Sequence, residues 1–284
     1  FLNKLLETDK DYVVAIDTDS IYVTFEDLID RVNPKNPVEF LDTIAKEKLE
    51  PMINSNYEEL SSYMNAYQNK MEMGREVIAD KGIWTAKKRY ILNVHDSEGV
   101  RFKTPKLKMM GIETAKSSTP MWCRKKLEDG IRTLMNGTES DVHEFIESSR
   151  IEFSKLPIEE VSFPRGVSDI KKYYNAASIY NKGTPIHVRG ALLYNNFLYK
   201  YNIDKKYPVI QNGEKIKFCY MKLPNIMNEN VISFVSALPK EFELESYIDY
   251  DTQFQKSFVE PLGVILDKIG WTTEPVSTLD SFFG

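Results

Sequence analysis

Two aspartates, Asp17 and Asp19, stand between the apolar runs Tyr12–Ile16 and Ile21–Val23. β-branched and aromatic residues on both sides of a polar tetrapeptide predict a tight β-hairpin with the acids at its tip. Because side chains alternate along extended backbone, the two carboxylates can point to one side. Such a pair can bind Mg²⁺ together with substrate phosphates, and two-metal sites catalyse nucleotidyl transfer. A solvated turn is the alternative, since Asp, Thr and Ser are common turn residues.

A second candidate site lies in the segment Trp84–Val94, which is rich in aromatic and basic residues. As a single strand, this segment would place Lys88 and Tyr90 on one face and Arg89 on the other. A lysine beside an aromatic hydroxyl suits contact with a nucleic-acid duplex, and Lys87 adds a further positive charge. A surface hairpin with incidental lysines is the alternative.

The composition indicates a folded chain with an uneven charge distribution. The 284 residues are 42% apolar, enough for about two domains with a core. The net charge is −5, yet twelve basic and three acidic residues lie in the range 81–126, whereas nine acidic and three basic residues follow residue 239. A basic middle region suits binding to a phosphate backbone, with a mixed solvated surface as the alternative. No apolar run approaches the length of a membrane span and no signal peptide opens the chain, which favours a soluble intracellular protein.

Helices and strands are both predicted, and the fold class is α+β. Apolar residues recur every three or four positions from 38 to 64, which predicts a helix packed under the sheet, with a kink or a new start at Pro51. Further helices are predicted over 191–199 and 247–269. The Asn212-Gly213 pair predicts a hairpin turn between two strands.

Another helix is predicted to begin near Pro120 and to end at Asn136-Gly137. Thr119 can cap its first turn. Because helix N-termini attract phosphate, Ser117, Ser118 and Thr119 are candidate backbone contacts to the phosphates of a nucleic acid.

The tetrapeptide Asp17-Thr18-Asp19-Ser20 resembles motif C of the family B DNA polymerases, a hairpin whose aspartates bind catalytic metal. Other segments resemble the second half of the replicative polymerases of T-even-like bacteriophages, and they occur in the same order. These segments are Pro51-Met52-Ile53, Lys87-Lys88-Arg89-Tyr90, Gly111-Ile112-Glu113-Thr114, Ser117-Ser118-Thr119-Pro120, His187-Val188-Arg189-Gly190, Gln255-Lys256-Ser257-Phe258-Val259 and Leu279-Asp280-Ser281-Phe282-Phe283-Gly284.

The resemblance implies three regions and a role for each motif. Residues 1–111 would form the C-terminal part of the palm, 112–274 a mostly helical thumb, and 275–284 a clamp-binding tail. Asp19 would be a direct ligand of two catalytic Mg²⁺ ions, with Asp17 as its partner. Lys88 and Tyr90 would form the KxY motif, which holds primer-template DNA through the minor groove. In the family, Tyr-Gly usually precedes the Asp-Thr-Asp-Ser sequence, and here Ala15-Ile16 stands in its place.

The closing tail carries three large apolar side chains, Leu279, Phe282 and Phe283, at the end of the sequence. Exposed apolar residues at such a place usually mark a binding partner. Their spacing resembles the peptide with which replicative polymerases bind a ring-shaped sliding clamp. A tail folded back onto the thumb is the alternative.

The implied function is part of a replicative DNA-directed DNA polymerase, acting in the cytoplasm of an infected bacterial host. It would add deoxynucleotides from deoxynucleoside triphosphates to a primer 3′ end on a template. The family's other metal-binding aspartate, its nucleotide-binding helix and its exonuclease would lie upstream of Phe1, so activity would require an N-terminal polymerase/exonuclease polypeptide or a missing segment. A non-catalytic subunit that grips DNA and tethers it to the clamp is the alternative, and a nuclease is a third reading.

Overall fold

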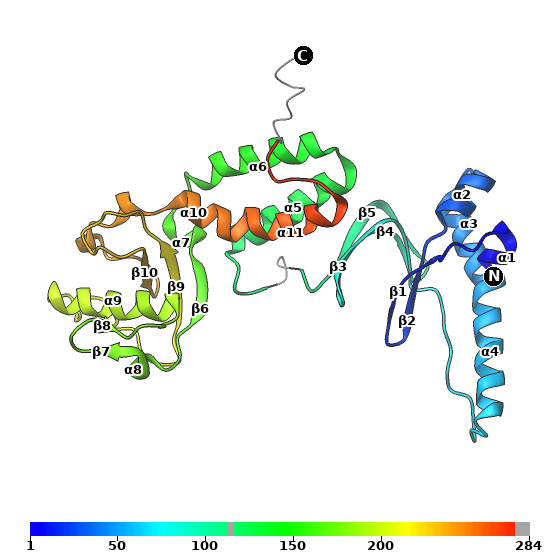
Figure 1. Ribbon diagram of the computed structural model, residues 1–284, viewed down its shortest axis with the longest axis horizontal. Helices are drawn as coiled ribbons and strands as arrows, with labels where there is room; N and C mark the ends of the chain where they lie inside the picture. The colour runs from blue at the N-terminus through cyan, green and yellow to red at the C-terminus, as the bar shows by residue number, and fades with distance from the viewer. Residues whose placement is uncertain (113–115, 276–284) are drawn as a thin grey trace, which may run out of the picture. The chain divides into compact units, whose positions relative to one another are not determined.

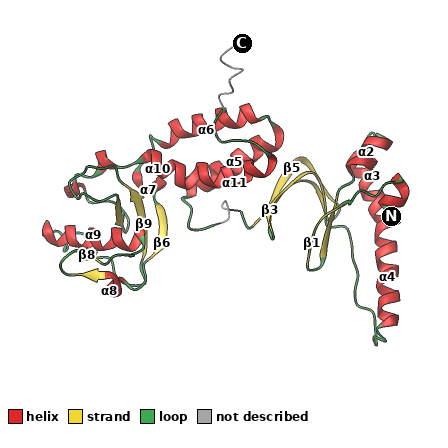
Figure 2. Ribbon diagram, in the orientation of Figure 1, coloured by secondary structure: helices red, strands yellow, loops and turns green. Residues whose placement is uncertain are grey.

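The computed structural model describes residues 1–112 and 116–275. Helices and antiparallel strands are mixed along the chain, which confirms the predicted α+β class (Figure 2). The chain divides into two compact units, Phe1–Met110 and Gly111–Gly284, each with its own helices and strands (Figure 1). None of the helices in these described ranges is both long enough and apolar enough to cross a membrane.

The first unit opens with the predicted hairpin. Its elements are α1 (Leu2–Leu6), β1 (Val13–Asp17), β2 (Ser20–Val23) and α2 (Glu26–Val32). β1 and β2 are antiparallel, and Ile16 lies opposite Ile21, which confirms the hairpin. A small apolar cluster of Leu2, Tyr12 and Leu28 joins the base of the hairpin to α1 and α2.

A long helical segment follows, made of α3 (Pro37–Ile44), a π-helical turn (Ala45–Leu49) and α4 (Glu50–Tyr63). Pro51 lies in the first turn of α4, directly after the π-helical turn, as the predicted restart requires. The expected packing under the sheet is wrong for α4, which has no buried residue. Its polar residues interrupt the apolar stripe, and Met52 and Leu60 are 40% and 42% exposed.

The sheet of the first unit contains β3 (Val77–Ala86), β4 (Arg89–Ser97) and β5 (Val100–Met110), paired antiparallel in that order. The prediction of a single strand over 84–94 is therefore wrong. The chain reverses at Lys87 and Lys88, where Lys88 has a positive φ of 59°. No Gly, Asn or Pro marks this turn in the sequence, which explains why the alternation pattern was misleading.

A buried charge network joins α3 to this sheet. The fully buried carboxylate of Asp96 accepts hydrogen bonds from Arg75, from the Gly99 N–H at 2.9 Å and from Arg101 Nε at 2.8 Å. Arg75 also pairs with Asp42 of α3 at 2.8 Å. Burial alone would raise the pKa of Asp96, but the hydrogen bonds from Arg75 and Gly99 hold it below the usual range.

The second unit is built from helices packed beside a three-stranded sheet. Its helices are α5 (Met121–Asn136), α6 (Glu139–Phe153), α7 (Ile158–Val161), α8 (Ile170–Tyr173), α9 (Ile186–Lys200), α10 (Tyr250–Phe254), a π-helical turn (Gln255–Val259) and α11 (Glu260–Leu266), with short 3₁₀ turns at Lys240–Phe242, Glu245–Tyr247 and Asp267–Ile269. Its strands are β6 (Phe163–Gly166), β7 (Tyr174–Asn175), β8 (Ile179–Tyr180), β9 (Lys215–Tyr220) and β10 (Val231–Phe234).

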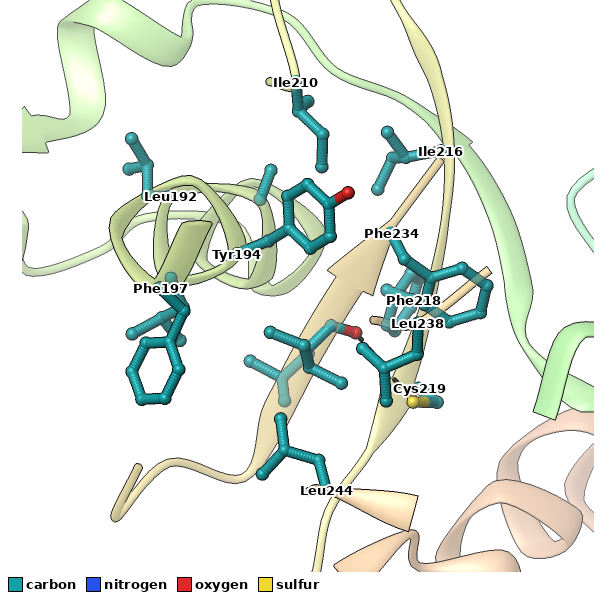
Figure 3. Packing of buried hydrophobic residues seen from close by; sticks show 14 of the residues in the cluster. Leu192, Tyr194, Phe197, Ile210, Ile216, Phe218, Cys219, Phe234, Leu238 and Leu244 are labelled. Carbon is teal, nitrogen blue, oxygen red and sulfur yellow. Dashed lines mark hydrogen bonds between the residues drawn. The ribbon is translucent and has the colours of Figure 1, made fainter. Parts of the chain in front are cut away.

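A large apolar core lies between α9 and the sheet of order β10-β9-β6 (Figure 3). Tyr194 from α9, Phe218 from β9 and Phe234 from β10 are all buried there. Gly190 explains part of the His-Val-Arg-Gly motif, because a Cβ at this position would lie 2.9 Å from the backbone nitrogen of Ser233. The glycine thus lets α9 approach β10 closely.

Several sequence predictions for this unit are confirmed and two are wrong. The helices expected over 191–199 and 247–269 are present, the latter beginning at Tyr250. α5 ends before Gly137 as predicted, but Pro120 occupies its N-cap and no side chain caps it. The hairpin expected at Asn212-Gly213 is wrong, because β9 pairs with β6 and β10 rather than with a strand before the turn.

Candidate active site and DNA-contact residues

The two candidate catalytic aspartates lie at the tip of the β1–β2 hairpin. Asp17 ends β1 opposite Ser20, and Thr18 and Asp19 form the connection. The Asp19 N–H donates to the Asp17 carbonyl at 2.7 Å across Thr18, whose φ is 55°. This is γ-turn geometry, and a β-branched residue in this region of φ is strained. Strained backbone of this kind is concentrated at functional sites.

The environments of the two carboxylates differ. Asp17 is partly buried, with a side chain 27% exposed, and its Oδ1 accepts a hydrogen bond from the Thr18 hydroxyl at 3.3 Å. Asp19 is exposed. Solvent-accessible carboxylate oxygens are suitable ligands for Mg²⁺. This ion binds one or two carboxylates and completes its coordination shell with water or phosphate. Within the described residues, no three acidic, histidine or cysteine side chains form a group that could hold a metal.

Lys88 lies beside this tip. Its Nζ is 3.8 Å from Asp17 Oδ1, and its side chain is 61% exposed. An exposed pair at this distance contributes little stability. The contact matters because it brings the two sequence motifs, about 70 residues apart, to one place.

Tyr90 links the hairpin to the sheet rather than lying on the surface. It is only 4% exposed, and its hydroxyl accepts a hydrogen bond from the Tyr22 hydroxyl at 3.0 Å. Tyr22 comes from β2, and its ring lies 5.4 Å from Tyr90 and 5.5 Å from Trp84, centre to centre. Burial raises the pKa of Tyr90 far above its ordinary value, so the phenol stays protonated.

Tyr22 is a site residue that the sequence reasoning missed. In the sequence, Tyr22 is only an aromatic residue in a predicted strand. Its partner Tyr90 lies 68 positions away, so no local pattern indicates the contact. The two other candidate DNA contacts, Lys87 and Arg89, are exposed on either side of Lys88. The turn between β3 and β4 therefore presents three consecutive basic residues next to Asp17.

The remaining DNA-contact candidates lie in the second unit, before α5. Ser117 is exposed, whereas Thr119 is only 5% exposed. The Thr119 N–H also donates to the Lys116 carbonyl at 3.1 Å, so its backbone is occupied. Arg165 donates to the Ser118 carbonyl at 2.7 Å and holds this segment beside β6. Ser117 and Ser118 are thus the better candidates for a phosphate contact.

The predicted clamp-binding residues Leu279, Phe282 and Phe283 lie outside the described residues. The segment that leads to them is fixed on α6. Thr272 donates from its N–H to Glu139 Oε1 at 2.7 Å, and its carbonyl lies 2.9 Å from His143 Nε2.

Along its whole length the chain is homologous to part of the family B DNA polymerases of T-even bacteriophages, as the motifs indicated. It is 36% identical over 303 residues to the DNA-directed DNA polymerase of Enterobacteria phage T4, which covers 100% of this chain and 33% of that protein. With the DNA-directed DNA polymerase of Escherichia phage RB69 it shares 36% identity over 282 residues, covering 92% of this chain and 31% of that protein. The chain therefore spans about one third of these relatives. No protein-family model matches it.

Proposed function

We propose that this chain forms the C-terminal palm region and the thumb of a replicative DNA-directed DNA polymerase. The assembled enzyme adds deoxynucleotides to a primer 3′ end as directed by a template. The observation that carries this proposal is the contact between the motif C hairpin and the Lys88–Tyr90 hairpin within one compact unit. In a polymerase, the catalytic acids and the residues that hold the primer must lie together.

Asp19 and Asp17 are the residues of this chain that would hold the two Mg²⁺ ions. When bound, these ions supply positive charge to the attacking and leaving oxygens of nucleotidyl transfer. Asp17 is fixed by its position at the end of β1 and by Thr18, whereas Asp19 projects from the turn as the more accessible ligand. Two carboxylates from this chain are enough only if substrate phosphates and a further acid complete the site.

Primer-template DNA is bound, in this proposal, by the basic turn next to the acids. Lys88, Lys87 and Arg89 neutralise phosphate charge close to the reacting end of the primer. Tyr90 acts mainly as a positioning residue, because its hydroxyl is occupied by Tyr22 and its ring is buried. The minor-groove contact implied by the resemblance would use the Tyr90 O–H as a donor, and it would require this buried hydroxyl to become exposed.

The second unit serves as the thumb and binds the DNA backbone through Ser117 and Ser118. Leu279, Phe282 and Phe283 dock the enzyme onto a sliding clamp. The Thr272 contacts with Glu139 and His143 support this role, because they hold the segment that precedes the tail against α6. An apolar tail on a fixed base loses less conformational freedom when it binds a partner.

The remaining acid, the nucleotide-binding residues and the exonuclease are supplied, in this proposal, by an N-terminal polypeptide or by an N-terminal segment of the same protein. The chain would act with it in the cytoplasm of the infected bacterial host. Support comes from the relatives, which are about three times as long.

Primer extension by the reconstituted enzyme tests this function. Labelled primer-template, Mg²⁺ and deoxynucleotides are incubated with this chain, with a polypeptide covering the part of the phage T4 polymerase that the chain does not match, or with both. We expect extension only in the mixture. Absence of extension in every mixture, or equal extension without this chain, would contradict the proposal. Degradation of DNA without nucleotides would instead indicate a nuclease.

A further inference from the structure

Arg165 joins two segments of the second unit that lie 47 positions apart in the sequence. Its Nη1 donates to the Ser118 carbonyl at 2.7 Å and to the Pro164 carbonyl at 3.0 Å. Arg165 belongs to β6, an outer strand of the sheet, where it pairs with Ile216 of β9. One guanidinium nitrogen therefore holds the segment before α5 against the edge of the sheet.

The bond from Arg165 fixes the turn that carries Ser117 and Ser118. The two serines are the central residues of this turn, which is closed by the hydrogen bond from the Thr119 N–H to the Lys116 carbonyl at 3.1 Å. That bond uses neither of the N–H groups of the two serines. Because the Ser118 carbonyl is bonded to Arg165, its negative charge is directed towards the guanidinium. The turn can then offer N–H and hydroxyl groups to a phosphate.

The guanidinium of Arg165 has donors to spare. It carries five N–H donors, and within the described residues only Nη1 is bonded to protein. The side chain is half-buried, and neither Nε nor Nη2 is a buried atom without a partner, so both face solvent. The free edge of a planar guanidinium matches the geometry of phosphate oxygens.

The positive charge of Arg165 acts on its surroundings, because its two bonds go to uncharged carbonyl oxygens. His187, in the first turn of α9, responds to this charge. Burial, followed by the charge of Arg165, holds the pKa of His187 below its ordinary value, against the opposing effect of the Gly166 backbone. No carboxylate contributes to this shift. A cation bonded only to carbonyls, beside two serines, is complementary to an anion.

We propose that Arg165 is a phosphate-contact residue of the second unit, which also positions Ser117 and Ser118 for the same stretch of DNA backbone. The inference rests on the proposed function, since it requires that this unit bind primer-template DNA. It adds the residue that joins the turn before α5 to the sheet. A contact of this kind orients the protein on DNA and reads no base sequence.

Variants of Arg165 and a matched control test the contact. Arg165→Ala removes both the charge and the bond to Ser118, whereas Arg165→Lys keeps the charge without the planar fork of donors. The control is Arg132→Ala, because Arg132 is an exposed arginine of α5 that pairs with Glu128. Circular dichroism verifies that each variant is folded. The probe is labelled primer-template DNA, and binding is measured by fluorescence anisotropy at several salt concentrations.

We expect Arg165→Ala to bind about tenfold more weakly than the wild type, with a logarithmic salt dependence shallower by about one. Arg165→Lys should keep the wild-type slope, and Arg132→Ala should bind like the wild type. The proposal would be overturned by an unchanged slope in Arg165→Ala, by a slope in Arg165→Lys as shallow as in Arg165→Ala, by an equal loss in Arg132→Ala, or by no binding of the wild-type chain.

The imidazole of His187 gives a second readout, which does not depend on affinity. A phosphate beside Arg165 offsets the charge that lowers the pKa of His187, so this pKa, followed by NMR, should rise when primer-template DNA binds. His143, held at the Thr272 carbonyl in the same unit, is the internal control and should not respond. A pKa of His187 that is unmoved by bound DNA would contradict a phosphate at Arg165.

Failure of this contact and failure of the polymerase function can be told apart. If the binding and NMR results hold but the mixture with the unmatched part of the phage T4 polymerase does not extend primers, the contact stands and the function fails. If the mixture extends primers while Arg165→Ala binds DNA as the wild type does, the function stands and the contact fails.

Discussion

The second unit buries a large apolar core between α9 and its sheet, whereas the first unit contains small clusters such as Leu2, Tyr12 and Leu28. The first unit also contains a buried charge network around Asp96. It also carries the candidate catalytic residues and exposes Ile16 and Ile21 of the hairpin. The unit with the candidate catalytic residues therefore has smaller buried apolar clusters than the large core of the second unit.

The largest effect is expected when a buried leucine is replaced by alanine, and the loss of stability can be compared between the two units. Leu244 is fully buried in the core of the second unit, and Leu28 is 4% exposed in the small cluster of the first. We expect Leu244→Ala to lower the free energy of unfolding of its unit by about 4 kcal/mol and Leu28→Ala by about 2 kcal/mol, because a small cluster relaxes around the cavity. Hydrogen exchange of backbone amides reports each unit separately. Equal losses of unfolding free energy in the two variants would contradict this difference between the units.

The next prediction concerns the buried carboxylate of the first unit. Asp96→Ala leaves the Arg75 and Arg101 guanidinium groups without this partner, and we expect a loss of about 3 kcal/mol. Because the pKa of Asp96 is lowered by folding, its contribution is present above the unfolded value of 3.8 and is lost as pH falls through the lower folded value. Acid titration of amide exchange should show this loss in the wild type. If Asp96→Ala lost stability at low pH as the wild type does, Asp96 would not be the group responsible for the acid sensitivity.

A smaller effect is expected for the hydroxyl pair that ties the hairpin to the sheet. A double-mutant cycle of Tyr22→Phe and Tyr90→Phe should give a coupling free energy of about 1 kcal/mol. The measurement is equilibrium unfolding of the first unit in urea. Strictly additive losses would show that the hydroxyl contact does not hold the hairpin.

The smallest effect is expected at the basic turn. Lys88→Ala should weaken binding of primer-template DNA a few-fold and make the logarithmic salt dependence shallower by about one. Lys4→Ala, which removes an exposed lysine from α1, is the matched control. Fluorescence anisotropy at several salt concentrations measures both. Identical slopes for Lys88→Ala and the wild type would place Lys88 away from the DNA.

Local patterns predicted the fold well where the signal lay within a few residues. The hairpin around Asp17 and the helix restart at Pro51 follow from alternation and from proline chemistry. The turn at Lys88 was missed because a lysine there adopts a conformation usually taken by Gly or Asn. The turn at Asn212-Gly213 was misread because the strand after it pairs with β6, about 50 residues earlier.

The sequence predicted the individual residues of the candidate site, but it did not predict the contacts between them. Residue types and spacing made Asp17, Asp19, Lys88 and Tyr90 candidates, and the resemblance to a family gave each a role. The contact of Tyr90 with Tyr22 and its burial depend on long-range packing, which no local pattern encodes. Tyr90 is thus buried and hydrogen-bonded to Tyr22 of the hairpin, and its contact with DNA stays a prediction.

Primer extension by Asp19→Asn tests the central claim most directly. The variant is compared with the wild type and with Asp9→Asn, which changes an exposed aspartate that precedes the β1–β2 hairpin. Each is mixed with the part of the phage T4 polymerase that the chain does not match. We predict that Asp19→Asn reduces extension at least about a hundredfold, because a metal ligand is lost, while DNA binding is unchanged. Extension by Asp19→Asn at the rate of Asp9→Asn would contradict a catalytic role for this hairpin.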